Sequence, residues 1–302
     1  MTRQRGGAAP AWDSVSRHRR AEVVAVDRLT TTGTVRITLA VSDDRPFAFS
    51  PGHWVGIEEE VPGRGTLRSP YCVFSPPGEK SRFEILVRVF PEGPLAHHLA
   101  SLRPGAPVRF RGPSGRSMLP KEPGTDLVLV ATGVGISPLH SLCLDLLAHD
   151  DHRPIRLYWG LRLSDDICLV DELDRLAASH RNFTYRISLS EPPPRWSQLR
   201  GRVTESVPPL LKTLGGSRFV LSGNGAMVEE MEVALSSLGV DRTLIHGERF
   251  FNIRHRPDPA TTEAIVARFV ARDLRSEHIN LADPAQMFPL HRDVHGRVVG
   301  PP

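Results

Sequence analysis

The segment Leu127-Val-Leu-Val-Ala-Thr-Gly-Val-Gly-Ile-Ser-Pro138 passes from an apolar run through two glycines into a helical pattern. Further along the chain, Phe219-Val-Leu-Ser-Gly-Asn-Gly-Ala-Met-Val228 shows the same order of features. A strand that leads through glycines into a helix presents free backbone N–H groups and the positive end of the helix dipole, which together suit a pyrophosphate. One such turn is common in α/β proteins, whereas two in one sheet predict a domain that binds a dinucleotide.

The second half of the chain alternates between strand-like and helical patterns. We predict strands at residues 127–131, 155–159, 183–189, 218–221 and 243–246, and helices at residues 138–149, 170–179, 204–214 and 226–238. This alternation predicts a doubly wound parallel sheet that binds its ligands at the carboxyl ends of the strands. We assign residues 121–251 to this α/β domain.

The first half consists of short β-rich runs separated by Pro- and Gly-rich turns. The runs are residues 21–29, 34–41, 54–58, 82–89 and 107–111, and one helical pattern covers residues 95–102. Strands at this spacing predict a small antiparallel barrel, to which we assign residues 21–120. Residues 1–20 are expected to form a disordered tail, and residues 252–302 an extension with one helix at residues 262–274.

Composition argues against several classes of protein. The 302 residues, 40% of them hydrophobic, can fill two cores, and no apolar run is long enough for a membrane span. The 38 Lys and Arg residues are interleaved with 34 acidic ones, so the net charge of +4 favours phosphate-bearing cofactors or an acidic partner over nucleic acid. The Gly-x-Ser-x-Gly motif of hydrolases is absent from the sequence.

The cysteines and histidines form no metal-binding pattern. Cys72, Cys143 and Cys168 are far apart and match neither a zinc site nor an iron–sulfur site. The histidines near the C-terminus lack the helical spacing of a metal site, so no metal is expected. Isolated cysteines of this kind favour a cytoplasmic location, where thiols stay reduced.

A series of short blocks, taken in order, resembles the ferredoxin–NADP reductase superfamily, including the reductases that feed bacterial oxygenases. These blocks are Phe49-Ser-Pro-Gly52, Arg68-Ser-Pro-Tyr-Cys-Val-Phe-Ser75, Val87-Arg88, Gly93-Pro-Leu-Ala96, Arg111-Gly-Pro-Ser-Gly115, Thr132-Gly-Val-Gly-Ile-Ser-Pro138, Ser222-Gly-Asn-Gly225 and Glu248-Arg-Phe-Phe251. The resemblance implies a six-stranded Greek-key barrel that binds FAD, followed by a nucleotide-binding α/β domain.

The resemblance implies the following flavin contacts. In the family's Arg-x-Tyr-Ser strand, the Tyr covers the flavin ring, the Arg pairs with the FAD pyrophosphate and the hydroxyl lies near flavin N5. The matching residues here are Tyr71, Arg68 and Cys72, with Val73 next to them. Further contacts are expected from the following strand and from a helix N-terminus: Val87, Arg88, Gly93, Pro94, Leu95 and Ala96.

The resemblance also implies a site for NADH or NADPH. Its expected residues are Thr132, Gly133, Gly135, Pro138, Arg162, Glu191, Gly223, Asn224 and Met227. Glu191 stands where NADP-binding relatives carry an Arg, and a carboxylate there can bind a ribose hydroxyl and repel a 2′-phosphate. We therefore favour NADH, while Arg195, Arg200 and Arg202 nearby leave NADPH open.

The implied reaction is hydride transfer from NAD(P)H to FAD, followed by electron transfer to a separate acceptor such as a ferredoxin or an oxygenase component. Hydride transfer requires the two rings to be held roughly 3–3.5 Å apart and shielded from water. The residues expected at the reacting atoms are Tyr71, Cys72, Ser222, Glu248 and Phe250.

Five positions depart from the family's pattern. Arg68 lies one residue early, and Cys72, Ala96, Ser222 and Gly225 replace a hydroxyl residue, a second hydroxyl residue, a Cys and a Pro. These departures leave two alternatives open. One is a non-catalytic or weakly active flavin-binding subunit, and the other is a reductase of free flavin, a quinone or dioxygen.

Overall fold

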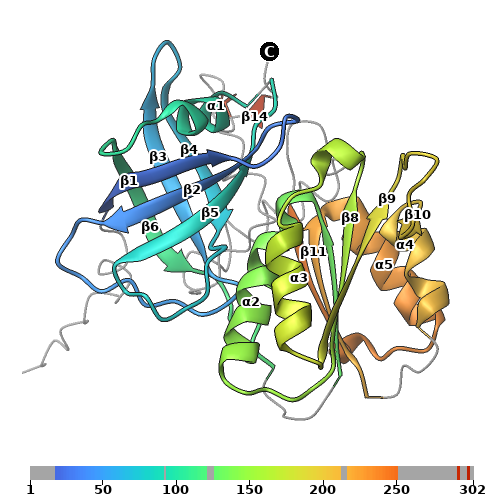
Figure 1. Cartoon of the computed structure of the whole chain (residues 1–302). Coiled ribbons are helices and arrows are strands. Elements are labelled where there is room, and N and C mark those ends of the chain that lie inside the picture. Colours follow the sequence, from blue (N-terminus) through green and yellow to red (C-terminus); the bar gives the residue numbers. More distant parts are fainter. Residues whose placement is uncertain are drawn as a thin grey trace, which may run out of the picture.

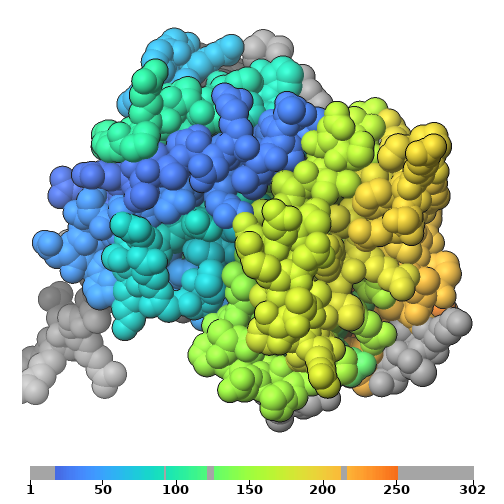
Figure 2. Space-filling view, viewed as in Figure 1, coloured from blue at the N-terminus to red at the C-terminus, as the bar shows by residue number. Residues whose placement is uncertain are grey.

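The computed structural model describes residues 18–91, 93–120, 126–211 and 216–250, and the backbone of residues 291–292 and 298–299. These residues form two domains that lie side by side, an antiparallel barrel and an α/β domain (Figure 1). In the space-filling view the blue strands of the barrel meet the yellow-green residues before helix α3 along a continuous seam (Figure 2). Among the described residues, no helix is long and apolar enough to cross a membrane.

The barrel is one six-stranded antiparallel sheet with the order β4-β3-β6-β1-β2-β5. An isolated bridge between Val73 and Ile85 joins its two edge strands. Helix α1 (Pro94–Ser101) buries Leu95 and Leu99 against the barrel core. The strands are β1 (Arg19–Arg28), β2 (Thr34–Val41), β3 (Trp54–Val61), β4 (Gly65–Cys72), β5 (Arg82–Arg88) and β6 (Pro107–Ser114). The predicted antiparallel barrel is confirmed.

The α/β domain is a parallel sheet with the order β10-β9-β8-β7-β11-β12. Its strands are β7 (Leu127–Thr132), β8 (Ile155–Leu161), β9 (Phe183–Leu189), β10 (Leu199–Arg200), β11 (Arg218–Asn224) and β12 (Ile245–Phe250). Helices α2 (Ile136–Ala148) and α3 (Val170–Ser179) cover one face, and α4 (Val203–Ser206) and α5 (Gly225–Ser237) cover the other. The predicted doubly wound sheet is confirmed. Because β7 pairs with both β8 and β11, the chain reverses its direction of winding at β7, where ligands bind in such sheets.

Three local predictions need correction. The helix expected over residues 204–214 ends at Ser206 and is followed by the 3₁₀ turn Pro208–Leu210, because two consecutive prolines supply no N–H donors and cannot continue a helix. The sequence analysis also missed β4 and the short strand β10. Strand β1 begins at Arg19, inside the stretch assigned to a tail.

Most of the N-terminal tail and the helix expected at residues 262–274 lie outside the described residues. In the C-terminal extension, β13 (His291–Arg292) pairs antiparallel with β14 (Val298–Val299).

The two domains share part of one core. Phe74, Leu86 and Met118 of the barrel belong to the same buried cluster as the apolar side chains of α2. Polar groups reinforce this contact, since the Ser141 hydroxyl donates a 2.8 Å hydrogen bond to the Ser75 carbonyl. The barrel and the sheet are therefore held in a defined relative position.

Candidate cofactor cleft

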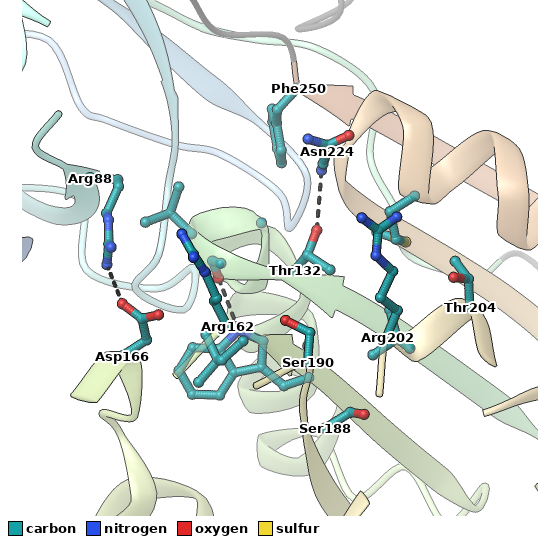
Figure 3. A pocket seen from close by; sticks show the side chains of 18 of the residues that line it. Arg88, Thr132, Arg162, Asp166, Ser188, Ser190, Arg202, Thr204, Asn224 and Phe250 are labelled. Carbon is teal, nitrogen blue, oxygen red and sulfur yellow. Dashed lines mark hydrogen bonds and ion pairs between the residues drawn. The ribbon is translucent and has the colours of Figure 1, made fainter. Parts of the chain in front are cut away.

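A cleft of about 560 Å³ lies between the barrel and the carboxyl ends of the parallel strands (Figure 3). The α/β domain lines it with the turns after β7 and β11, and the barrel lines it with residues of β2 and β5 and the segment after β5. Its lining includes Thr34, Arg88, Phe90, Thr132, Gly133, Gly135, Asn224, Met227 and Phe250. Several of these were expected as cofactor ligands, and the fold brings them together at the point where the winding reverses.

The two glycine turns touch each other at the base of the cleft. A Cβ on Gly135 would lie 2.5 Å from the Ser222 carbonyl oxygen, and a Cβ on Gly223 would lie 2.2 Å from the Thr132 hydroxyl. Gly223 also has a φ of +150°, which L side chains rarely adopt. The Thr132 hydroxyl accepts a 3.1 Å hydrogen bond from the Asn224 N–H and so ties the turns together. Only glycine permits this approach at residues 135 and 223.

The turn after β7 suits a phosphate group. It is a 3₁₀ turn, Gly133–Gly135, that leads directly into α2, and no side chain caps either N-terminus. Gly133 has a φ of +53° and open space where its Cβ would be, so the backbone is accessible from the cleft. The indole N–H of Trp159 donates a 2.9 Å hydrogen bond to the Gly133 carbonyl and fixes the turn from behind. Exposed N–H groups at a helix start bind phosphates.

Hydroxyl and guanidinium groups line the outer end of the cleft. Arg162 and Arg202 reach it from β8–α3 and from the start of α4, and Ser188 and Ser190 lie at the end of β9. Arg162 donates a 2.8 Å hydrogen bond to Glu191, which raises the pKa of the Arg162 guanidinium. The Glu191 carboxylate predicted to bind a ribose is therefore at the rim, paired with Arg162.

Arg88, which was expected to contact FAD, lines the cleft, and its guanidinium spans the two domains. It lies 2.9 Å from the Asp166 carboxylate, which also accepts a 2.6 Å hydrogen bond from the Thr32 hydroxyl. Burial works to raise the pKa of Asp166, but the hydrogen bonds from Thr32 and the Leu163 N–H and the charge of Arg88 outweigh it, so the pKa is lowered. Asp166 is thus ionised and joins the β8–α3 segment to the barrel.

Cys72, Glu248 and Phe250, which were predicted near the reacting atoms, come together in the structure. Cys72 is buried against Trp54 and Phe250. Burial raises the pKa of the Cys72 thiol well above its ordinary value, and the negative charge of Glu248 adds to this effect. Cys72 is therefore a neutral thiol at physiological pH.

Ser222 is placed beside this group by the sheet, because it is the register partner of Glu248 on the neighbouring strand. Its side chain is fully buried. Within the part of the chain that the structure describes, its hydroxyl has no hydrogen-bond partner. A buried polar group without a partner costs stability.

Tyr71 and Arg68 lie on opposite faces of β4, because side chains alternate along a strand and the two residues are separated by an odd number of positions. Arg68 bonds to the buried Glu58 on the outer face. Tyr71 packs at the edge of the barrel core, as Ala96 of α1 does, and burial raises its pKa to about 12. The one-residue shift seen in the sequence therefore separates the expected guanidinium from the expected aromatic wall.

The remaining predicted residues lie either in a buried core or at the start of helix α1. Val73 and Val87 are buried in the barrel core, so that only their backbone can face a cofactor. Pro138 is buried within α2. Gly93 and Pro94 begin α1, which has no side-chain cap and no acidic residue in its first turn, and its N-terminal N–H groups at Leu95 and Ala96 suit the FAD pyrophosphate.

The sequence analysis missed several residues of the cleft. They include Thr34, Phe90, Asp166, Ser188, Ser190 and Thr204. Ser190 directly precedes Glu191 in the stretch considered for the nucleotide, whereas the other five belong to no short motif and reach the cleft from elements far apart in the sequence. The uncapped starts of α1 and α2, the accessible Gly133 backbone and the Arg and Ser side chains of the cleft fit two nucleotide cofactors. FAD, when bound, accepts a hydride from a reduced nicotinamide and releases the electrons singly.

Comparison with known proteins supports this interpretation domain by domain. Residues 23–118 match the family described as oxidoreductase FAD-binding domain, and residues 129–232 match the oxidoreductase NAD-binding domain. The chain is 33% identical to ferredoxin–NADP reductase B of Sorangium cellulosum over 218 residues, which cover 69% of this chain and 88% of that protein. It is 29% identical to the ferredoxin–NAD(P)(+) reductase component of a naphthalene 1,2-dioxygenase/salicylate 5-hydroxylase system of Ralstonia sp., over 76% of this chain and 68% of that protein.

Among solved structures, the chain resembles a cytochrome P450 reductase of Amycolatopsis with a TM-score of 0.70 and 28% identity, over 77% of this chain and 69% of that chain. A ferredoxin NADP+ reductase from Neisseria gonorrhoeae, with bound FAD and NADP, shares the fold with a TM-score of 0.66 and 20% identity, over 78% of this chain and 99% of that chain. The fold, the paired domains and these similarities agree. The chain belongs to the ferredoxin–NADP reductase superfamily and is an FAD- and NAD(P)H-dependent oxidoreductase that passes electrons to an acceptor.

Proposed function

We propose that this protein oxidises NADH through FAD and reduces an acidic iron–sulfur protein, such as a ferredoxin, as its physiological acceptor. The observation that carries the proposal is the cleft in which the touching glycine turns of the α/β domain face the flavin domain. Relatives named ferredoxin–NAD(P)(+) reductase components support the class of acceptor. The three cysteines are free thiols, and we place the protein in the cytoplasm, where thiols stay reduced.

Glu191 supports the choice of NADH. It lies at the rim of the cleft beyond the end of β9, and its carboxylate is held by Arg162 at 2.8 Å. A carboxylate at this place can accept a hydrogen bond from a ribose hydroxyl, and it repels a 2′-phosphate. Arg162 is ion-paired with Glu191. Arg202, which is 67% exposed, lies 3.9 Å from Glu230. Both guanidiniums thus face a carboxylate that would compete with a phosphate.

The variant Glu191→Arg is expected to raise the ratio of NADPH to NADH use by about 10-fold, because it exchanges a repulsive for an attractive charge near the 2′ position. The measurement is kcat/KM with each nucleotide. Asp165→Arg, at an exposed carboxylate of the β8–α3 segment that does not line the cleft, is the matched control for the charge change. An unchanged ratio in Glu191→Arg would rule out this role for Glu191.

A basic face on the flavin domain supports an acidic acceptor. Arg20, Arg109, Glu58 and Arg68 follow one another in register across β1, β6, β3 and β4. The carboxylate of Glu58 is buried beneath Arg68 and Arg111, whose side chains are 63% and 43% exposed. Burial works to raise the pKa of Glu58, yet the hydrogen bonds from Arg68 and His18 outweigh it and lower the pKa. On this face Arg20, Arg68, Arg109 and Arg111 outnumber the acidic residues Glu22, Glu58 and Glu60, of which Glu60 lies 3.8 Å from Arg109. We name this surface the arginine face.

The arginine face leads toward the predicted reacting residues. Trp54 and Cys72 lie on the same side of the sheet as Glu58 and Arg68, four residues before Glu58 on β3 and four residues after Arg68 on β4. That separation corresponds to about 13 Å at 3.3 Å per residue. Trp54 and Cys72 contact Phe250 at the domain boundary. An acidic protein docked on the arginine face is therefore close to the site of flavin chemistry.

Reversing two charges of the arginine face tests the acceptor. The double variant Arg20→Glu, Arg109→Glu leaves the ion pairs of Glu58 intact, and it is expected to lower the second-order rate of reduction of an acidic [2Fe–2S] ferredoxin about 10-fold at low salt. The effect should shrink as salt rises, and flavin reduction by NADH should not change. Arg181→Glu, at an exposed arginine two residues before β9, is the control. Equal rates for the variant and the control would exclude docking on this face.

A further inference from the structure

The two cofactor sites belong to different domains, so the distance between the reacting rings depends on how the domains are joined. Besides the Arg88–Asp166 ion pair and the hydrogen bonds Thr32–Asp166 and Ser141–Ser75, a further polar group joins strand β2 to helices α2 and α3. It consists of Arg36, Phe74, His140 and Glu172, which we name the interdomain clasp. Phe74 belongs to the block Arg68–Ser75, whereas Arg36 and His140 lie outside the quoted motifs. The proposed reaction does not use any of the four residues directly.

The centre of the clasp is a stack of three planar groups. The His140 ring of α2 lies parallel to the Phe74 ring of the barrel, with centroids 4.1 Å apart and an angle of 5° between the planes. The Arg36 guanidinium lies 5.0 Å from the centroid of the Phe74 ring. His140 and Phe74 are almost fully buried. A buried stack of this kind fixes orientation as well as distance.

Glu172, in the first turn of α3, joins both ends of the stack. One carboxylate oxygen accepts a hydrogen bond from the Arg36 guanidinium. The other lies 3.5 Å from His140 Nε2. Glu172 therefore connects strand β2 of the flavin domain to helix α2 of the nucleotide domain.

The hydrogen bond at His140 Nδ1 determines whether Nε2, which faces the Glu172 carboxylate, is a donor or an acceptor. His140 Nδ1 lies 3.3 Å from the Phe74 carbonyl, which can only accept, so Nδ1 carries the proton. In the neutral ring, Nε2 is then an acceptor that faces a carboxylate oxygen. Within the described part of the chain, Nε2 makes no hydrogen bond. An amide at residue 172 could accept from Arg36 and donate to Nε2, which makes Gln the natural rescue variant.

Helix α2 connects the interdomain clasp to the cleft. Helix α2 starts directly after the turn Gly133–Gly135 that lines the cleft, and His140 lies little more than one turn into this helix. On the next residue, the Ser141 hydroxyl bonds to the Ser75 carbonyl at 2.8 Å. A shift of α2 relative to the barrel therefore moves the nucleotide-binding turn relative to the flavin domain.

We propose that Glu172 is a positioning residue for hydride transfer, which sets the spacing between the two cofactor sites through Arg36 and His140 without touching either cofactor. The inference rests on the proposed function, because it assigns a role in the same reaction. A misplacement of about 1 Å costs on the order of 100-fold in rate when two reacting groups must meet. Glu172 acts through α2 and β2, so its loss should affect the rate of transfer much more than binding.

Three variants at two adjacent residues separate positioning from general damage. In Glu172→Ala, the rate constant of flavin reduction at saturating NADH is expected to fall about 10- to 100-fold. Its flavin content and its Kd for NAD+ should stay within about two-fold of the wild type. Glu172→Gln should recover most of the rate at pH 8, because the amide satisfies Arg36 and His140 Nε2 together. Asp171→Ala removes an exposed carboxylate from the same turn and should behave as the wild type.

Hydrogen exchange gives a readout that does not depend on activity. Glu172→Ala should speed amide exchange in residues 73–76 and 163–173, and Glu172→Gln should not. If Glu172→Ala does not fold, Arg36→Leu removes the same link from the barrel side and should reproduce both effects. A wild-type rate in Glu172→Ala, or a loss of nucleotide binding equal to the loss of rate, would overturn the inference. If neither nucleotide reduces the wild type, the proposed function fails, and exchange alone decides whether the clasp joins the domains.

Discussion

Replacing Gly135 with alanine is expected to abolish nucleotide binding and to lower the free energy of unfolding by about 3 kcal/mol. The added Cβ would lie 2.5 Å from the Ser222 carbonyl oxygen and 2.7 Å from Gly223 Cα. These are backbone atoms of β11, which is paired on both sides within the sheet and cannot move aside. The two glycine turns would separate, and the base of the cleft would lose its shape. Chemical denaturation and a titration with NAD+ measure the two effects.

Gly133 provides the matched control in the same turn. Its φ of +53° is unfavourable for alanine, but no atom lies within 4 Å of the added Cβ. Gly133→Ala should therefore cost only about 1 kcal/mol of stability. Equal stabilities for the two variants would show that the contact between the turns is not required.

His140 is expected to make the protein less stable in acid. Burial lowers the pKa of His140 to about 4, although the Phe74 carbonyl and the charge of Glu172 work to raise it. The unfolded chain has an ordinary histidine pKa near 6.5 and binds the proton first as the pH falls. Above about pH 6.5, His140 is neutral in both states and does not lower the free energy of unfolding. The loss of stability begins near pH 6.5 and grows as the pH falls toward 4. It reaches about 3 kcal/mol of lost stability, since one unit of pKa corresponds to about 1.4 kcal/mol.

The variant His140→Phe isolates this effect. Phenylalanine keeps a flat ring against Phe74 but cannot bind a proton. Other groups near the clasp also titrate or carry charge, namely Arg36 on β2, Glu84 on β5, Cys168 before α3 and Glu172 on α3. Because they are present in both proteins, the difference between the two stability curves reports His140. The wild-type curve should fall below that of the variant between pH 6.5 and 4, and parallel curves would contradict the assignment.

The sequence predicts the architecture well because the decisive signals are local. The apolar runs and glycines at Gly133, Gly135 and Gly223 lie within single strand–turn–helix units, and these units place the cleft. Alternating patterns likewise predict most of the strands. The helix predicted at residues 204–214 is wrong because helical periodicity continues through Pro208 and Pro209, whereas the prolines end the helix.

The contacts between domains could not be predicted in this way. The pairs Arg88–Asp166 and Arg36–Glu172 join residues that are far apart in the sequence, and no spacing rule relates them. Arg68 illustrates a further limit. Its shift by one residue is visible in the sequence, but its partner Glu58 becomes evident only when β3 and β4 are paired in register. Pairing and packing decide these contacts, and both depend on the complete fold.

The most direct test of the whole account is an anaerobic titration of the purified, FAD-loaded protein with NADH and NADPH separately, followed by visible absorbance. NADH is expected to bleach the absorbance of the oxidised flavin rapidly, and NADPH is expected to do so less efficiently. A bound flavin that neither nucleotide reduces would contradict this expectation and favour the non-catalytic flavin-binding subunit. A colourless protein that cannot be reconstituted with FAD or FMN would contradict the assignment of a flavin site altogether.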